Sequence, residues 1–131
     1  MATLDTTLFA TESYLVTTEK TAKEMGSGSL PVLATPALVA MMEHCACKAL
    51  EEALEEGQTS VGTGLQMSHT AATPVGMTVT CTAKVSAVEG RKICFEITAS
   101  DEKGEIGSCR HERFLVLADR FTEKTYQKLE K

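Results

Sequence analysis

Apolar and polar residues alternate along the second half of the chain with the two-residue period of half-buried β-strands. The clearest case is residues 76–88, where threonines and a lysine alternate with valines, a cysteine and an alanine. The turns "VEGRK" (88–92) and "DEKGE" (101–105) are short and contain glycine, so they predict antiparallel hairpins between neighbouring strands. Together these signals predict strands at about 59–70, 76–88, 91–101 and 105–118.

A helical period precedes these strands in the segment "TPALVAMMEHCACKALEEALEEG" (35–57). Thr35 is suited to the N-cap, Pro36 to the first turn and Gly57 to the end of a helix. We therefore predict an amphipathic helix of about 20 residues. Its predicted apolar face contains Leu38, Val39, Met42, Ala46, Ala49, Leu50 and Ala53.

Shorter elements are predicted elsewhere in the chain: a strand at 13–17, a polar helical turn at 18–25, a loop at 26–31 and a short helix at 119–131. The predicted fold class is α+β, with one domain over residues 1–131 in which the long helix covers one face of an antiparallel sheet. Because a single helix leaves part of a twisted sheet uncovered, we expect a homodimer.

Charge and composition exclude several classes of partner. The net charge of −5 argues against nucleic acid, because that binding depends on Lys and Arg neutralising phosphates. A local basic patch for a small anionic ligand remains compatible with this charge. No segment approaches the roughly 18 apolar residues of a membrane span, and the N-terminus has no basic start followed by an apolar run. We therefore expect no membrane partner and a cytoplasmic location.

The five cysteines are odd in number and form no C-x-x-C pair. We expect all of them to be reduced and mostly buried, without a disulfide framework. The same spacing argues against a zinc site, so we expect no metal.

His69 is a titratable residue inside an apolar, strand-like stretch, "GLQMSHTAATPVGMTVTCTAKV" (64–85). In a regular strand it shares a face with Val61, Thr63, Leu65 and Met67, so its ring is predicted to point toward the helix or a pocket. Two interpretations remain open: a core histidine bonded to a backbone carbonyl, or a functional base or orienting group.

Glu43 lies at the edge of the helix's apolar face, directly after two methionines. Two interpretations remain open for this carboxylate. It bends toward solvent, or it lies in a cleft, where its pKa is raised or a partner forms a hydrogen bond with it. Thr35 at the helix start is either a plain N-cap or a hydroxyl placed where a developing anion is stabilised. Gly62 and Gly64 indicate a β-bulge or a close approach of a ligand or another backbone segment. In a regular strand both glycines lie on the face opposite His69.

Four segments together resemble the fluoroacetyl-CoA thioesterase group of the hotdog-fold thioesterases: "ATPALVAMMEHCACKAL", "VGTGLQMSHTAATPVGMTVT", "VEGRK" and "EIGSCRHERFLV". The resemblance covers about residues 30–120. It implies a hotdog fold, in which a curved antiparallel sheet wraps a long central helix. It also implies a homodimer with edge-to-edge sheets, acyl-CoA bound at the subunit interface, and hydrolysis of the thioester with no cofactor other than the coenzyme A of the substrate.

The resemblance assigns roles to individual residues. The family's catalytic threonine, glutamate and histidine fall on Thr35, Glu43 and His69, its glycine near the thioester carbonyl on Gly62, and the arginine of "HER" on Arg113. Thioester hydrolysis needs a nucleophile, proton transfer and oxyanion stabilisation. Glu43 is a candidate nucleophile or a base for water, and His69 a candidate proton donor. Thr35 is a candidate for orienting them or for direct attack.

One feature departs from the family pattern. The fluoroacetyl-specific member uses aromatic side chains over its pocket, in the segment before the catalytic threonine. Here that segment is "EMGSGSLPVLAT", and no Phe, Tyr or Trp occurs between Tyr14 and Phe95. The lid is therefore expected to be small, with a broader short- or medium-chain acyl-CoA substrate.

Three other functions remain open at this stage: a non-catalytic hotdog protein that binds an acyl thioester, an enoyl-CoA hydratase, and a dimeric module without a small ligand. The hydratase motif, an Asp/His pair with different spacing, is not found. Arg91 and Lys92 are candidates for the anionic end of coenzyme A, or ordinary solvated turn residues.

Overall fold

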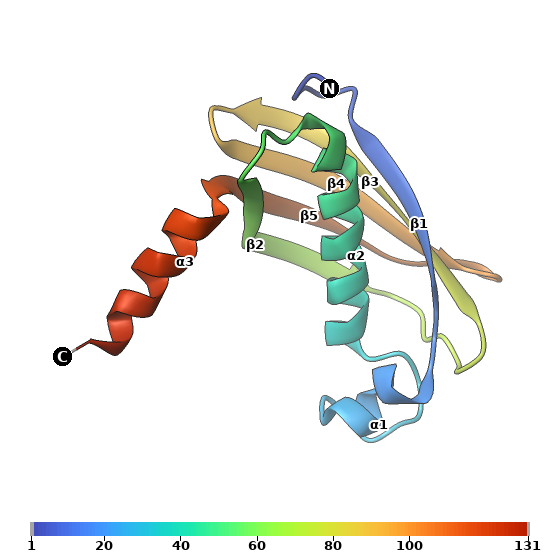
Figure 1. Ribbon diagram of the computed structural model, residues 1–131. Coiled ribbons are helices and arrows are strands. Elements are labelled where there is room, and N and C mark those ends of the chain that lie inside the picture. The colour runs from blue at the N-terminus through green and yellow to red at the C-terminus, as the bar shows by residue number, and fades with distance from the viewer. Residues whose placement is uncertain (1, 131) are drawn as a thin grey trace.

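One long helix lies across one face of a five-stranded antiparallel sheet in the computed structural model, which describes residues 2–130 (Figure 1). The strand order is β1-β3-β4-β5-β2. The strands are β1 (Phe9–Leu15), β2 (Gln58–His69), β3 (Thr78–Glu89), β4 (Lys92–Asp101) and β5 (Gly104–Leu117). The α-helices are α1 (Ala22–Met25), α2 (Thr35–Leu50) and α3 (Ala118–Tyr126), and 3₁₀ turns occupy Thr18–Lys20, Glu51–Ala53 and Gln127–Leu129.

The four strands predicted from alternation are confirmed, as are both hairpins. Gly90 and Gly104 occupy positive φ angles of 63° and 150° in the two turns, a region that favours glycine. The first strand begins at Phe9 rather than at residue 13, because its backbone pairs with β3 along its whole length, whatever the side-chain pattern. The loop at 26–31 and the C-terminal helix are close to their predicted positions.

Helix α2 begins at Thr35, one residue earlier than an N-cap at Thr35 implies, and it ends at Leu50, followed by a 3₁₀ turn to Ala53. Gly57, at φ 80°, forms the turn into β2 and does not end the helix. The predicted N-cap is wrong: Ala34 occupies that position, without a side-chain cap bond, and Pro36 lies in the first turn. The buried residues of α2 are Ala37, Leu38, Met41, Met42, Cys45, Ala46, Ala49 and Leu50. The predicted face was wrong at Val39, which is only half-buried, and it lacked Ala37, Met41 and Cys45.

The core between α2 and the sheet is largely aliphatic, as the composition indicates. Ile93, Phe95 and Ile97 of β4 are buried against the helix together with Met42 and Leu50. The five thiols are free; the buried ones are Cys45, Cys81 and Cys109. Within residues 2–130, no helix has the length and apolar character needed to cross a membrane.

Strands β1 and β2 form the two edges of the sheet. Helix α3 leaves the end of β5 and projects beyond the β2 edge without burying any of its own residues (Figure 1). The β2 edge therefore has unpaired backbone groups along its outer side, which is the property of a strand available for pairing with another chain.

Candidate active site

The Thr35 hydroxyl and the His69 ring form a hydrogen-bonded pair. Thr35 is the first residue of α2 and His69 the last residue of β2, and Thr35 Oγ1 lies 2.9 Å from His69 Nδ1. The Thr35 hydroxyl therefore contacts the His69 ring from the first helical position, one residue after the N-cap Ala34. The other ring nitrogen, His69 Nε2, is buried and makes no hydrogen bond within the described residues.

A cavity of about 290 Å³ opens beside this pair. Most of its walls are small side chains from the segment before α2 and from the residues after His69, so little bulk stands over the hydroxyl. Its lining is Ala22, Ser27, Val32, Leu33, Thr35, His69, Thr70, Ala71 and Ala72. The cavity therefore leaves room for a ligand beside the Thr35 hydroxyl.

A β-bulge in β2 changes which residues share a face with His69. Gly62 pairs with Arg113 and Gly64 with Glu112, so Thr63 is an extra residue in the strand. Residues before the bulge therefore change sides relative to a regular strand. The predicted common face of His69 with Val61 and Thr63 is wrong, and Gly62 lies on the same face as His69, toward α2.

Glu43 is held over Gly62. Its Oε2 accepts a hydrogen bond of 3.1 Å from Arg113 Nη1, and a Cβ added at Gly62 would lie only 2.5 Å from that oxygen. Of the two interpretations of Glu43, the hydrogen-bonded carboxylate is therefore the one observed. Glycine at position 62 is what allows the carboxylate to approach the strand so closely.

Arg113 is buried and fully engaged. Its Nε donates to Ser60 Oγ (2.8 Å) and its Nη2 donates to the Ser60 carbonyl (3.1 Å). Its Nη1 lies 3.1 Å from His111 Nε2 as well as from Glu43. Because a guanidinium only donates, His111 Nε2 accepts, and the guanidinium is fixed on three sides in a planar arrangement that suits a carboxylate.

His111 is the residue of this site that the motif analysis did not single out. Its Nδ1 donates to the Gly64 carbonyl (2.8 Å), so its ring is the neutral Nδ1–H tautomer. Burial lowers the pKa of His111, and the adjacent Arg113 guanidinium acts in the same direction against the opposing bond to Gly64. A signal for His111 was available in the two-residue alternation of β5. His111 and Arg113 occupy the inward-facing positions between the buried residues Cys109 and Leu115.

The predicted residues thus form two groups in one chain: Thr35 with His69, and Glu43 with Gly62 and Arg113. No hydrogen bond or ion pair joins the two groups in residues 2–130. Thr35 and Glu43 lie eight residues apart on α2, a rise of about 12 Å along the helix.

Comparison with known proteins identifies the family. The model of the fluoroacetyl-CoA-specific thioesterase family matches residues 16–119. The chain belongs to this family. A fluoroacetyl-CoA thioesterase from Streptantibioticus cattleyicolor is 43% identical over 97 residues, which are 74% of this chain and 70% of that protein. The resemblance inferred from the motifs is confirmed, and the family match begins at residue 16 rather than at about residue 30.

Solved structures give the fold of the family. A structure of the fluoroacetyl-CoA thioesterase FlK is 36% identical, with a TM-score of 0.87 over 92% of this chain and 93% of that one. A thioesterase superfamily member from Thermus thermophilus is 29% identical, with a TM-score of 0.84 over 93% of this chain and 90% of that one. The predicted hotdog fold is confirmed.

Proposed function

We propose that this protein hydrolyses small acyl-CoA thioesters to the free acid and coenzyme A through Thr35, Glu43 and His69. Membership of a thioesterase family makes it a thioester hydrolase. The observation that carries the assignment of residues is the 2.9 Å bond between Thr35 and His69 beside a cavity lined by small side chains. A hydroxyl paired with an imidazole is a recurrent arrangement in acyl transfer.

In this proposal each group has a separate task. Thr35 orients the His69 ring, and His69 Nε2–H protonates the departing thiolate as the carbon–sulfur bond breaks. Glu43, fixed by Arg113 against Gly62, either takes a proton from the water that attacks the acyl carbon, or attacks that carbon itself. The second route gives a mixed anhydride, which water then hydrolyses to the free acid and the Glu43 carboxylate. The Gly62 backbone N–H and the N-terminus of α2 stabilise the oxyanion. The reaction needs no metal or other cofactor, so chelators leave the rate unchanged.

A second copy of the chain completes the site in this proposal. Two β2 edges that pair antiparallel about a two-fold axis place the His69 end of one strand beside the Gly62 end of the other. Thr35 and His69 of one copy then face Glu43 of its partner. This arrangement explains why the Thr35–His69 pair and the Glu43 group lie apart in a single chain. It puts the acyl thioester at the subunit interface of a homodimer, which we propose to be cytoplasmic.

The substrate range follows from the segment before α2. Residues Gly26 to Leu30 are exposed and contain no aromatic ring, and the cavity beside Thr35 is lined by small residues. We therefore propose a broader range of short- and medium-chain acyl groups than selective fluoroacetyl recognition would give.

The test is release of free thiol from a panel of acetyl-, fluoroacetyl-, longer aliphatic and aromatic acyl-CoAs, comparing wild type with Glu43→Gln and His69→Gln. We expect turnover of several short acyl groups by wild type and losses of about 10²-fold or more in both variants. Absence of turnover across the panel favours the non-catalytic binding function. Turnover confined to fluoroacetyl-CoA contradicts the proposed substrate range.

A further inference from the structure

Arg113 Nη1 serves two acceptors, the Glu43 carboxylate and the His111 ring. It lies 3.1 Å from Glu43 Oε2 and 3.1 Å from His111 Nε2. The hydrogens on this nitrogen lie in the plane of the guanidinium at fixed angles, so a hydrogen held by His111 leaves the other aimed at Glu43. His111 Nε2 itself is 3.9 Å from the carboxylate oxygen, which is too far for a hydrogen bond. His111 therefore acts on Glu43 through Arg113.

His111 lies behind the carboxylate, on the side away from solvent. The side chains of His111 and Arg113 are 1% and 8% exposed, whereas that of Glu43 is 40% exposed. The His111 ring is also held in place, because it stacks on Phe95 with the ring centres 6.0 Å apart and its Nδ1–H donates to the Gly64 carbonyl. A substrate can therefore reach Glu43 without touching His111.

This network needs His111 in its neutral form. Because Nδ1 carries the hydrogen that bonds Gly64, Nε2 is the acceptor for Arg113. A proton on Nε2 turns that acceptor into a donor and places its positive charge 3.1 Å from a guanidinium nitrogen. The Arg113 guanidinium then turns away from the ring, and Glu43 loses the hydrogen bond that fixes it over Gly62.

The charged groups that act on the His111 ring come from β5 and α2. Glu112 is the next residue on β5, so its side chain points to the opposite face of the sheet, where it pairs with Lys92. The residues beside the ring on the two neighbouring strands do not ionise; they are Leu65 and Phe95. Among the described residues, Arg113 of β5 and Glu43 of α2 are therefore the charges that face the ring.

We propose that neutral His111 positions the Glu43 carboxylate for the chemical step through Arg113, and that a proton on His111 ends this positioning. The proposal rests on the role of Glu43 in the proposed thioester hydrolysis. His111 is a positioning residue, because it touches Arg113 and not the substrate. Burial lowers the pKa of His111, so its ring is neutral above pH 6.5, and turnover falls as the pH falls through the pKa of the folded protein.

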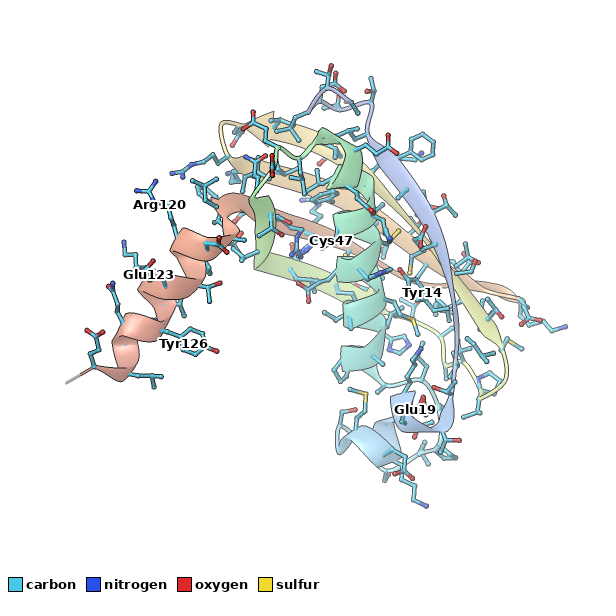
Figure 2. All side chains as sticks on the ribbon, viewed as in Figure 1. Tyr14, Glu19, Cys47, Arg120, Glu123 and Tyr126 are labelled. Carbon is cyan, nitrogen blue, oxygen red and sulfur yellow. The ribbon has the colours of Figure 1, made fainter. Side chains whose placement is uncertain are left out.

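His44 provides a matched control, because it directly follows Glu43 on α2 but its ring lies on another side of the helix. His44 Nδ1 lies 2.7 Å from the Tyr14 hydroxyl. Tyr14 belongs to β1, which runs along the side of α2 away from β2 (Figure 2). His44→Gln therefore removes an imidazole while leaving the described hydrogen bonds of Glu43 and Arg113 in place.

The first test compares two substitutions of His111 that differ in the acceptor. His111→Gln places an amide oxygen near the position of Nε2, whereas His111→Leu has no acceptor; both lose the bond to the Gly64 carbonyl. We expect His111→Leu to lower kcat for acetyl-CoA about tenfold or more, with KM within about twofold of wild type. His111→Gln and His44→Gln should retain kcat within about threefold.

Two results of this comparison overturn the proposal. One is a folded His111→Leu variant with the kcat of wild type. The other is an equal loss of kcat in His111→Gln and His111→Leu, which would show that His111 acts through its packing and its bond to Gly64 instead of through the acceptor.

The second test is the pH dependence of kcat/KM for acetyl-CoA between about pH 8 and 5.5. The glutamine amide does not titrate, so we expect His111→Gln to lose less activity on acidification than wild type, and His44→Gln to follow wild type. Superimposable profiles of wild type and His111→Gln overturn the proposal, as does an equal change in His44→Gln. This comparison decides the matter if His111→Leu does not fold.

If wild type turns over no acyl-CoA, the proposed function fails, and NMR titration decides separately whether His111 holds Arg113 in place. The ring nitrogens of His111 and the guanidinium of Arg113 are followed as the pH falls. We expect both to change at one midpoint, in wild type and in His44→Gln. Arg113 signals that stay constant while His111 takes up its proton overturn the proposal.

Discussion

The Thr35 hydroxyl oxygen lies 2.9 Å from His69 Nδ1, which joins the start of α2 to the end of the edge strand β2. This contact connects residues 34 positions apart and is the link between the long helix and the strand that carries both Gly62 and His69. The contact uses only the Thr35 hydroxyl oxygen. Substitutions can therefore remove the methyl group and the hydroxyl one at a time and show which of them matters.

Thr35→Ser keeps the oxygen and should retain kcat/KM within about threefold, whereas Thr35→Val keeps the shape and should lose about 10²-fold. The reason is that valine cannot orient the imidazole. Steady-state thiol release from acetyl-CoA measures both variants. Equal activity of Thr35→Val and wild type would remove Thr35 from the catalytic set.

Gly62→Ala should reduce kcat/KM by about 10- to 100-fold, because its Cβ would lie 2.5 Å from Glu43 Oε2 and displace the carboxylate. Gly64→Ala is the matched control, since its Cβ would meet only Glu112 at an ordinary 3.7 Å. We expect the control to retain wild-type rates. If both variants behave alike, the close approach of Glu43 to Gly62 has no role in the reaction.

His111 predicts a specific dependence of stability on pH. Burial lowers its pKa below the ordinary 6.5, so the unfolded chain binds a proton more readily than the folded chain as the pH falls from that value. The free energy of unfolding should therefore decrease on acidification, by at most about 1.4 kcal/mol per pH unit from this group. Its contribution is complete above pH 6.5 and is lost as the pH falls through the folded value.

Urea titrations between roughly pH 7.5 and 5.5, the range where a histidine changes charge, measure this slope. They compare wild type with His111→Gln, which has no titratable group at this position. The variant is expected to be less stable overall but to have a shallower slope. The slope, rather than the absolute stability, is the readout. Identical slopes would show that His111 is not the titrating group.

Mixing two inactive variants tests the site shared between copies. Refolding Glu43→Gln together with His69→Gln should restore about a quarter of wild-type activity, because half of the dimers are then hybrids with one intact site each. Each variant refolded alone is the control. Absence of any restoration, with dimers present by light scattering, would place the complete site in one chain.

Much of the fold was predictable because it rests on local patterns. Alternation and the glycine turns located β3, β4 and β5 within about two residues. The end of α2 was missed because the residues after Leu50, mostly Glu, Ala and Leu, are good helix formers. The chain leaves the helix there to enter β2, and tertiary packing overrides this local preference.

The site was predictable mainly through the resemblance, and its geometry was not. The bulge at Thr63 arises from pairing with β5, and it puts Gly62 on the face of His69, where a regular strand would not. Similarly, the contact of Glu43 with Arg113 joins residues 70 positions apart. Gly62 and Gly64 signalled a bulge or a close approach, but no local signal gives the consequence of the bulge for the face of Gly62 or the contact of Glu43 with Arg113.

The most direct test of the account is the kcat/KM of the double variant Glu43→Gln/His69→Gln on acetyl-CoA, measured beside the two single variants. If the two residues act in one reaction, each single variant loses about 10²-fold or more, and the double variant loses far less than the product of the two. Single variants with wild-type rates, or losses that multiply as for independent sites, would contradict the assignment of Glu43 and His69 to one thioesterase site.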